Sequence, residues 1–252
     1  MTVAAGGRGR SALRRSIAWY LRQWSRILNV LSDEELDRLI PLLSERTLRP
    51  RQQLFSTGEP PDRVYVLLKG RVKVYQVAEN GKEIILDIVT RGGIVGDMAI
   101  VENGERTACA QAMEETVAVT ISWEDFSYFL QQSPRLGFAM VELMARRLSG
   151  MQQTLMSLVS KPVSARLAGF LMAAQEGGVV APGLTHAEMA QSIGTSRESV
   201  TALLGRFVAL GALAPEPGGY RIVNEGILAA IANGEIAVSP RHPVGRAPAA
   251  AG

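Results

Sequence analysis

The stretch THAEMAQSIGTSRESVTALLGRF, residues 185–207, predicts two short helices joined by a tight turn. Thr185 suits the N-cap of the first helix, and Ser196 suits the N-cap of a second helix that begins at Arg197. Gly194 supplies the backbone freedom that the turn between them needs. Apolar residues recur on the faces that would meet where the helices cross: Met189, Ile193, Val200, Leu203 and Leu204. The pattern therefore predicts a helix-turn-helix.

The polar side of the second predicted helix carries side chains that recognise base edges. Arginine pairs bidentately with guanine, and glutamate accepts a hydrogen bond from the cytosine amino group. In a helix-turn-helix this end of the second helix enters the major groove of double-stranded DNA. We predict DNA contacts for Thr195, Ser196, Arg197, Glu198, Thr201 and Ala202. The alternative is an ordinary helical hairpin with a surface ion pair.

Residues 214–223, APEPGGYRIV, predict two short strands joined by a Pro-Gly-Gly turn. A hairpin at this place forms a wing beside the recognition helix. Arg206 and Arg221 are the candidates for phosphate contacts there.

Length and composition indicate a globular protein with room for two domains, because 47% of the 252 residues are hydrophobic and 20% are charged. We find no apolar run of the roughly 18 residues that a membrane span requires, and no secretory signal. We therefore expect a cytoplasmic protein without a membrane partner. The single cysteine, Cys109, agrees with a reducing compartment.

Charge is unevenly distributed along the chain. Residues 1–30 carry six arginines and no acid, whereas residues 31–133 hold 11 basic and 17 acidic residues, a net charge of −6. Residues at helical spacing predict a basic amphipathic helix in the N-terminal arm: Leu13, Ile17, Leu21, Trp24 and Leu28. The arm either attaches to a membrane or packs on its own domain or partner subunit. We prefer packing, because a second membrane-anchoring signal is missing.

The next segment changes from helix to strands. Ser32 suits the N-cap of a helix that extends to about Leu43. Alternating or β-branched runs then predict strands, separated by glycine turns, over residues 63–68, 70–77, 83–89 and 107–121. Short strands at regular spacing predict a small antiparallel barrel or jelly roll, so the expected fold class is α+β.

Within the predicted barrel, residues 94–112 bring together groups that suit a cyclic nucleotide. Gly96 allows close approach of the backbone, and a helical turn over residues 97–100 would present backbone N–H groups to an anion. Asp97 is suited to accept hydrogen bonds from ribose hydroxyls. Arg106 and Thr107 offer a guanidinium and a hydroxyl to a phosphodiester. The alternative is a surface loop with an ion pair between neighbouring side chains.

Over residues 31–235 the chain resembles the CRP/FNR family of bacterial transcription regulators. Cyclic-nucleotide-binding members of that family carry Gly-Glu-aliphatic, then a loop, then Arg-Ser/Thr-Ala. The corresponding residues here are Gly-Asp-Met at 96–98 and Arg-Thr-Ala at 106–108. Aspartate in place of glutamate shortens the reach to the ribose by one methylene. The resemblance implies a cyclic-nucleotide-binding jelly-roll barrel, a long dimerisation helix and a winged helix-turn-helix.

The resemblance also implies domain boundaries and site residues. The expected parts are a basic arm over 1–30, a sensor domain over 31–133, a dimerisation helix over 134–160, a DNA-binding domain over 161–235 and a flexible tail over 236–252. The expected ligand-binding residues are Gly96, Asp97, Met98, Ala99, Arg106, Thr107, Val74, Leu86, Arg147, Met151 and Gln152.

The identity of the nucleotide stays open. Met151 and Gln152 stand where the family's cyclic AMP receptor has a threonine and a serine for adenine, whereas Thr107 resembles a threonine of cyclic-GMP-binding domains. Cyclic AMP and cyclic GMP are both candidates. Arg147 aligns with a family arginine that meets the pocket acid, here Asp97. The alternative for Arg147 is a solvated helix charge.

Apolar residues in the long helix follow alternating spacings of three and four, which is typical of a two-stranded coiled coil. We therefore predict a homodimer. The predicted seam consists of Val141, Met144, Leu148, Met151, Leu155 and Leu158.

Other effectors and activities fit the chain poorly. Both histidines, His186 and His242, lie outside the sensor domain, where a haem ligand would be needed. One cysteine cannot hold an iron–sulfur cluster, and Cys109 on a predicted strand suits the core better than a redox switch. No P-loop, zinc-binding HExxH or nucleophile elbow is present, so we expect no enzyme activity.

Together these features predict a homodimeric regulator that binds a palindromic DNA site under the control of a cyclic nucleotide. RNA polymerase is an expected further partner. Two alternatives remain: a DNA-binding regulator of the same type that needs no ligand, and a nucleotide-binding protein that acts through protein contacts.

Overall fold

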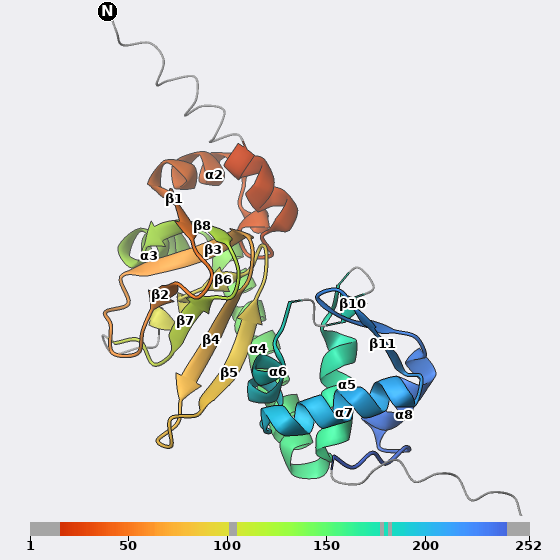
Figure 1. Cartoon of the computed structure of the whole chain (residues 1–252). Helices are drawn as coiled ribbons and strands as arrows, with labels where there is room; N and C mark the ends of the chain where they lie inside the picture. The colour runs from red at the N-terminus through yellow and green to blue at the C-terminus, as the bar shows by residue number, and fades with distance from the viewer. Residues whose placement is uncertain (1–15, 101–104, 177–178, 181–182, 241–252) are drawn as a thin grey trace, which may run out of the picture. The chain divides into compact units, whose positions relative to one another are not determined.

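The computed structural model describes residues 16–100, 105–176, 179–180 and 183–240. The chain divides into two compact units, Met1–Leu148 and Ser149–Gly252 (Figure 1). The 27-residue helix α4, Pro134–Ser160, begins in the first unit and ends in the second. Among the residues described, none of the helices combines the length and apolar character needed to span a bilayer.

The first unit is built around two antiparallel four-stranded sheets, with strand orders β1-β8-β3-β6 and β2-β7-β4-β5. This arrangement is the predicted jelly-roll barrel. Its strands are β1 (Ser44–Leu48), β2 (Gln53–Phe55), β3 (Arg63–Lys69), β4 (Val72–Val77), β5 (Glu83–Val89), β6 (Ile94–Val95), β7 (Cys109–Ala112) and β8 (Thr116–Ser122). Its helical elements are a helix over residues 16–24, η1 (Leu28–Val30), α2 (Asp33–Leu39), η2 (Ile40–Leu42), η3 (Asp97–Ile100) and α3 (Trp123–Gln132).

Two sequence-based expectations in this unit need correction. The single strand predicted over residues 107–121 is two strands, β7 and β8, because the chain turns between Ala112 and Thr116. Cys109 lies on β7 as expected, but it is half-buried beside Thr57 rather than part of the core. The residue faces outward because its neighbour Ala110 takes the inward position, which the alternation of a strand requires.

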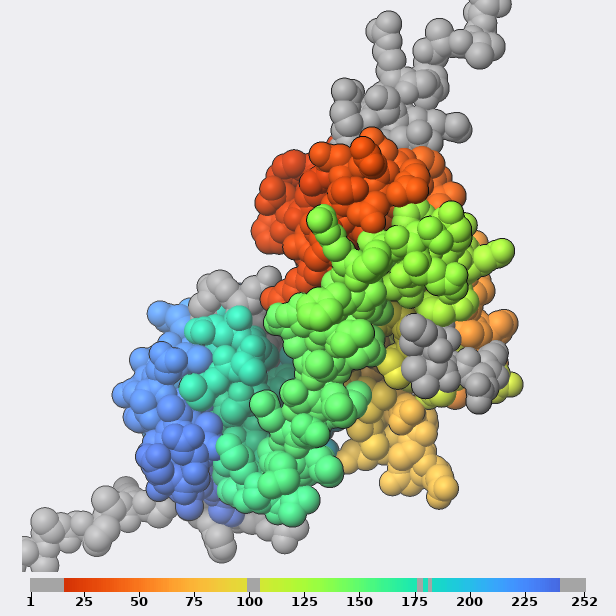
Figure 2. All heavy atoms as spheres, turned by 180° about the vertical axis from the view of Figure 1, so that it is seen from behind, coloured from red at the N-terminus to blue at the C-terminus, as the bar shows by residue number. Residues whose placement is uncertain are grey.

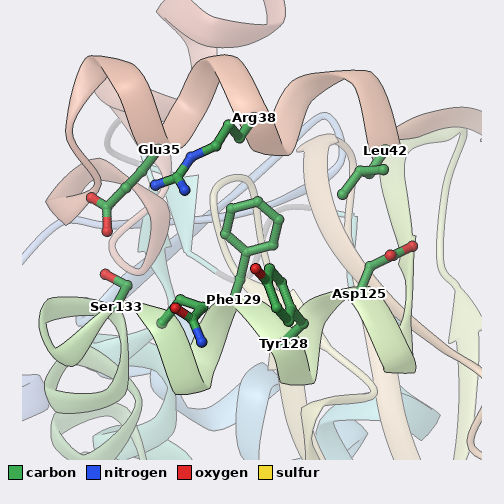
Figure 3. A pocket seen from close by; sticks show the side chains of 8 residues that line it. Glu35, Arg38, Leu42, Asp125, Tyr128, Phe129 and Ser133 are labelled. Carbon is green, nitrogen blue, oxygen red and sulfur yellow. The ribbon is translucent and has the colours of Figure 1, made fainter.

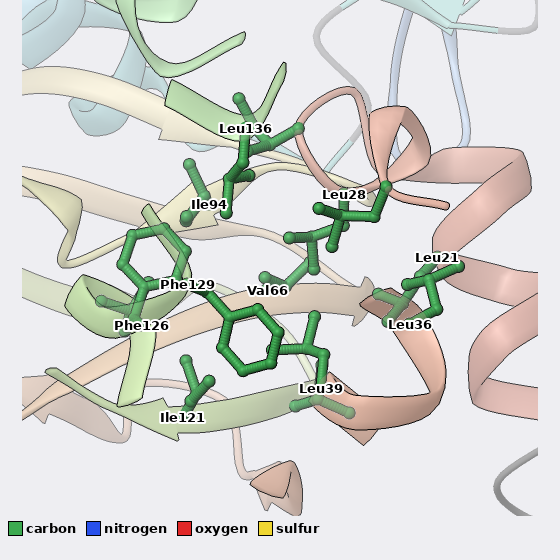
Figure 4. Close-up of a cluster of buried hydrophobic side chains, with 14 of the residues drawn as sticks. Leu21, Leu28, Leu36, Leu39, Val66, Ile94, Ile121, Phe126, Phe129 and Leu136 are labelled. Atoms are coloured by element: carbon green, nitrogen blue, oxygen red, sulfur yellow. The ribbon is translucent and has the colours of Figure 1, made fainter. Parts of the chain in front are cut away.

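The largest core of the first unit joins the barrel to the helices that precede and follow it (Figure 4). Ile17 and Leu21 are buried in this core, so the N-terminal helix packs on its own unit. Trp24 departs from the predicted apolar stripe: it is 42% exposed, and the Arg91 guanidinium lies 3.3 Å from its ring centroid. Leu13, the remaining predicted position of that stripe, lies outside the described residues.

The second unit contains the predicted helix-turn-helix and wing. Its elements are α5 (Val163–Ala173), β9 (Gln175–Glu176), β10 (Val179–Val180), α6 (His186–Ile193), α7 (Arg197–Ala209), β11 (Leu213–Glu216), β12 (Gly219–Ile222) and α8 (Glu225–Asn233). The strands form one sheet in the order β11-β12-β10-β9. The helices surround an apolar core that includes Leu167, Val200, Leu204, Phe207 and Leu228.

Local sequence explains the boundaries of α6 and α7. The hydroxyl of Thr185 accepts from the backbone N–H of Glu188, and the Glu188 carboxylate accepts from the backbone N–H of Thr185, which forms a capping box. Gly194 ends α6 with φ at +66°, a conformation that glycine adopts without strain. Ser196 then caps α7 through the backbone N–H of Ser199. The predicted turn geometry is thereby confirmed.

Candidate functional site

The first candidate site begins where β6 ends. Gly96 has a φ of +87°, and a Cβ atom added there would lie 2.9 Å from the Arg63 carbonyl oxygen and 3.1 Å from Arg106 Nη1. Such distances leave no room for a side chain. Gly96 therefore lets η3 start directly against Arg106, and η3 begins with Asp97 as predicted.

Arg106 lies inside the barrel although it carries a permanent charge. Only 2% of the residue is exposed. Its Nη1 atom donates to the Gly96 carbonyl at 2.8 Å, and Nη2 donates to the Arg63 carbonyl at 2.6 Å. The guanidinium carbon also lies 4.2 Å from the centroid of the Phe55 ring. These contacts hold a buried positive group at the place where the sequence predicts recognition of a phosphodiester.

Asp97 is also almost completely buried and is paired with α4. Arg147 Nη1 donates to Asp97 Oδ2 at 2.7 Å, and Arg147 Nη2 donates to the Ile94 carbonyl at 3.0 Å. The Arg147 Nε atom lies 3.7 Å from a carboxylate oxygen of Asp87. Burial raises the pKa of Asp97, while the charge and hydrogen bond of Arg147 act to lower it. Asp97 is thus tied to α4 through the arginine that the sequence suggested.

The other predicted ligand-binding residues of the first unit differ in exposure. Val74 is partly buried against the barrel core, whereas Thr107 is exposed. Leu86 is 41% exposed at a β-bulge, because Val74 pairs with Asp87 and Tyr75 pairs with Ile85. Leu86 therefore faces solvent.

Four further residues were predicted to contact the ligand, and no hydrogen bond or ion pair joins their side chains to Asp97 or Arg106 in the described part of the chain. Met98 is 43% exposed on η3. Ala99 belongs to the same turn, but its side chain lies outside the description. Met151 and Gln152 are exposed on α4 within the second unit. Their role in binding stays a prediction.

A separate pocket of about 230 Å³ lies between α2, η2 and α3 (Figure 3). It is lined by Glu35, Arg38, Leu42, Asp125, Tyr128, Phe129, Gln132 and Ser133. None of these is a predicted ligand-binding residue. The Ser133 side chain and the Ser32 backbone N–H bind the Glu35 carboxylate and lower its pKa.

The second candidate site is the N-terminal part of α7. Arg197 and Glu198 are exposed in its first turn, as reading of base edges requires. Hydrogen bonds from the backbone N–H of Glu198 and from Ser196 lower the pKa of the Glu198 carboxyl. The carboxylate therefore acts as an acceptor at neutral pH. Thr195 and Ala202 are partly exposed, and Ser196 is exposed.

Three other predicted DNA contacts already have partners within the second unit. Arg221 Nε lies 2.6 Å from a carboxylate oxygen of Glu216, its neighbour in the wing. Arg206 donates to the backbone carbonyl of Ser239. Thr201 donates its hydroxyl to the Arg197 carbonyl at 3.0 Å. A phosphate that binds either arginine must therefore compete with an internal acceptor.

Sequence reasoning missed two residues on this surface. His186 Nδ1 lies 2.8 Å from Thr201 Oγ1, and His186 Nε2 lies 3.4 Å from the Tyr220 hydroxyl. The two rings are stacked with centroids 6.3 Å apart. The contact joins residues 34 positions apart in the chain, and no local spacing signals it.

Two family models match parts of the chain that contain most residues of the two sites, and Arg147 lies between the matched regions. Residues 45–133 match the family model of the cyclic nucleotide-binding domain, and residues 165–231 match the Crp-like helix-turn-helix domain. The first match contains Gly96, Asp97 and Arg106. The second contains α6, α7 and the wing.

Two relatives and one solved structure illustrate the similarity. The CRP-like cAMP-activated global transcriptional regulator of Mycobacterium tuberculosis is 32% identical over 63% of this chain and 74% of its own length. The fumarate and nitrate reduction regulatory protein of Salmonella typhimurium is 30% identical over 80% of this chain and 84% of its own. The structure of FixK2 from Bradyrhizobium japonicum shares the fold, with a TM-score of 0.68 and 18% identity over 75% of this chain and 96% of its own.

These similarities cover the barrel and the helix-turn-helix alike. The chain therefore belongs to the CRP/FNR family of DNA-binding transcription regulators and carries a cyclic nucleotide-binding domain.

Proposed function

We propose that this regulator binds DNA as a homodimer under the control of a cyclic nucleotide held in the barrel. The observation that carries the proposal is the pair of buried, oppositely charged groups Asp97 and Arg106 beside Gly96. A buried acid suits ribose hydroxyls and a buried base suits a phosphate, so the pair suits a cyclic nucleotide. A relative named as cAMP-activated supports an effector of this class.

The choice between cyclic AMP and cyclic GMP belongs to the same proposal. Thr107 directly follows Arg106 and offers a hydroxyl that suits either the phosphate or a guanine amino group. Met151 and Gln152 provide no hydroxyl for an adenine amino group. We therefore keep both nucleotides as ligands to be tested.

Calorimetric titration of the full-length protein with cyclic AMP, cyclic GMP and cyclic di-GMP tests the proposal. We expect one of the first two to bind, and Arg106→Gln to weaken that binding at least tenfold, because a charge-assisted contact to the phosphate is lost. Lys82→Gln removes an exposed charge from the β4–β5 turn and serves as the matched control.

Two results of the titration would contradict the proposal. If none of the three nucleotides binds, that result contradicts the proposed control by a cyclic nucleotide and favours the alternative of a ligand-independent regulator of the same family. If Arg106→Gln binds as well as the unchanged protein while Lys82→Gln binds more weakly, the site lies elsewhere.

The dimer is supported by the exposed face of α4. Residues at alternating spacings of three and four are all exposed along this helix: Phe138, Val141, Ala145, Leu148, Gln152, Leu155 and Val159. Figure 2 shows α4, in green to teal, at the surface of one face of the molecule. A mostly apolar stripe of this period fits a two-stranded coiled coil.

This stripe differs from the seam predicted by sequence, although five residues of that seam are also exposed: Val141, Leu148, Met151, Leu155 and Leu158. Val141, Leu148 and Leu155 belong to both. Met144 instead packs partly buried against the core of the first unit, and the side chain of Leu158 lies against Gly194 of the turn between α6 and α7. Both side chains therefore have contacts within their own chain.

Contact with RNA polymerase stays a prediction.

A further inference from the structure

The ring of His186 connects three elements of the DNA-binding surface. His186 is the first residue of α6, Thr201 lies on α7, and Tyr220 lies on strand β12 of the wing. The imidazole is within hydrogen-bonding distance of both other side chains, and it stacks on the Tyr220 ring with an interplanar angle of 30°. A single side chain thus links the recognition helix to the wing.

The directions of these hydrogen bonds follow from the Arg197 backbone carbonyl, which can only accept. A backbone carbonyl has no proton, so the Thr201 hydroxyl must donate its single proton to the Arg197 carbonyl. The Thr201 oxygen then accepts from His186 Nδ1–H. In the neutral ring the proton on Nδ1 leaves Nε2 as an acceptor, which receives the Tyr220 hydroxyl proton. The chain of donors runs from the wing to the first turn of α7.

The elements that carry His186 and Tyr220 are both held in place. His186 follows the capping box in which Glu188 accepts from the N–H and the hydroxyl of Thr185, so the start of α6 is fixed and the Glu188 carboxylate is occupied. Tyr220 pairs with Pro215 and Val180 in the sheet and packs partly buried on the core of the second unit. The imidazole therefore lies between two anchored supports.

The arrangement decides which part of Thr201 is available to DNA. Its side chain is exposed, yet its hydroxyl donates to one group and accepts from another. The hydroxyl therefore has no proton left to donate to DNA and keeps one acceptor lone pair, whereas the methyl group is available for apolar contact. In the major groove a methyl group makes apolar contact with the 5-methyl group of thymine.

We propose that His186 and Tyr220 are positioning residues that hold Thr201 so that its methyl group, rather than its hydroxyl, reads a thymine. This inference rests on the proposed binding of DNA and deepens it. It assigns a role to two residues that need not touch a base, and it specifies the chemistry of recognition at one position of the half-site.

The experiment uses the full-length protein and an operator selected from a random DNA library. Each thymidine of a half-site is replaced in turn by deoxyuridine, which differs only by the missing methyl group, and affinity is measured by fluorescence anisotropy. We expect the loss at one position to be about fourfold, the effect of one buried methyl group.

Five variants and one control separate the roles. Thr201→Ser keeps the hydroxyl but not the methyl group and should lose the discrimination at that position. Thr201→Val keeps a methyl group but loses the hydrogen bond with His186 and should weaken the discrimination. His186→Phe keeps a stacked ring without hydrogen bonds and should lose the discrimination, and His186→Asn restores a donor near the place of Nδ1 and should recover it. Tyr220→Phe should reduce it, while Tyr75→Phe, which removes a hydroxyl bonded to Gln53 in the barrel, is the matched control.

The outcomes distinguish this inference from the proposed function. If the selection yields no operator, the proposal of sequence-specific DNA binding is wrong, and this inference is overturned with it. If an operator is found but Thr201→Ser or His186→Phe shows the same deoxyuridine effect as the unchanged protein at every position, this inference is overturned while the proposed DNA binding stands. Circular dichroism identifies any variant that fails to fold, and His186→Asn and Thr201→Val then supply the comparison.

Discussion

The geometry of the barrel site depends on Gly96, Asp97 and Arg147, whose surroundings leave little room for another side chain. Gly96 is surrounded by the Arg63 carbonyl and Arg106, so a larger residue would displace the arginine or the backbone. Asp97 is buried and depends on Arg147, which itself also binds the Ile94 carbonyl. A charge buried in this way is costly unless it is paired. The same residues that suit a ligand therefore also determine the stability of the unit.

We predict that Arg147→Gln destabilises the protein at neutral pH by up to about 3 kcal/mol, because it leaves Asp97 buried without its cation. The sign of the pH dependence follows from the pKa. In the folded state the pKa of Asp97 is already raised above its ordinary value of 3.8, and loss of Arg147 raises it further. A raised pKa favours the fold below about pH 4, and that benefit is lost as pH rises through the folded-state pKa.

The destabilisation by Arg147→Gln should therefore grow from pH 4 to pH 7. Urea unfolding across this range measures it. Arg146→Gln is the matched control, since Arg146 is 65% exposed and pairs with Glu142 on the surface of the same helix. That variant should change stability by about 0.5 kcal/mol or less at every pH. If Arg147→Gln lowers the free energy of unfolding equally at pH 4 and pH 7, Arg147 does not act by pairing with the Asp97 carboxylate.

At the scale of helices and strands, the sequence predicts features that depend on neighbouring residues, such as helix caps and turns. It misses features that depend on contacts between residues far apart in the chain. The caps Thr185 and Ser196 and the turn at Gly194 follow from interactions within four residues, and the structure has them. The face of α4 that remains open depends on where the rest of the chain folds. Spacing predicted one apolar stripe. Packing partly buries Met144 of that stripe and places Leu158 against Gly194, although Leu158 stays 42% exposed.

The candidate sites divide in the same way. The positions of Asp97 and Arg106 beside Gly96 were predictable because a single segment carries all three residues. The link from His186 to Tyr220 was not, because it depends on how the wing folds back onto α6. The internal partners of Arg206 and Arg221 were also not predictable, since Ser239 and Glu216 are ordinary surface residues in the sequence.

Two adjacent substitutions on α4 test which stripe forms the dimer. Val159 is 82% exposed, whereas Leu158 is 42% exposed and contacts Gly194. We expect Val159→Asp to weaken dimerisation about tenfold or more, because a coiled-coil seam would bury an unpaired carboxylate. Leu158→Asp should lower the stability of the second unit and affect dimerisation less. Sedimentation equilibrium and urea unfolding measure the two effects, and the reverse pattern would favour the seam predicted by spacing.

At the scale of the whole molecule, one continuous helix carries residues of both functions. Arg147, near the middle of α4, pairs with the acid of the candidate nucleotide site, and the last turns of α4 contact the helix-turn-helix through Leu158 and Gly194. The proposed regulation requires that the nucleotide binds one conformation of the proposed dimer better than another. Whatever factor the nucleotide adds to DNA affinity, DNA must add to nucleotide affinity, because the two equilibria share one cycle.

We therefore predict a reciprocal effect that Arg147→Gln reduces. With the selected operator, the nucleotide that binds should change DNA affinity by about 5- to 150-fold, and calorimetry in the presence of operator should show the same factor for the nucleotide. In Arg147→Gln both factors should shrink together, because the pocket acid loses its contact with α4, while Arg146→Gln should leave both unchanged. DNA affinity without nucleotide separates this loss of coupling from a loss of folding. Equal factors in Arg147→Gln and the unchanged protein would mean that control passes from the barrel to DNA by a route other than this arginine.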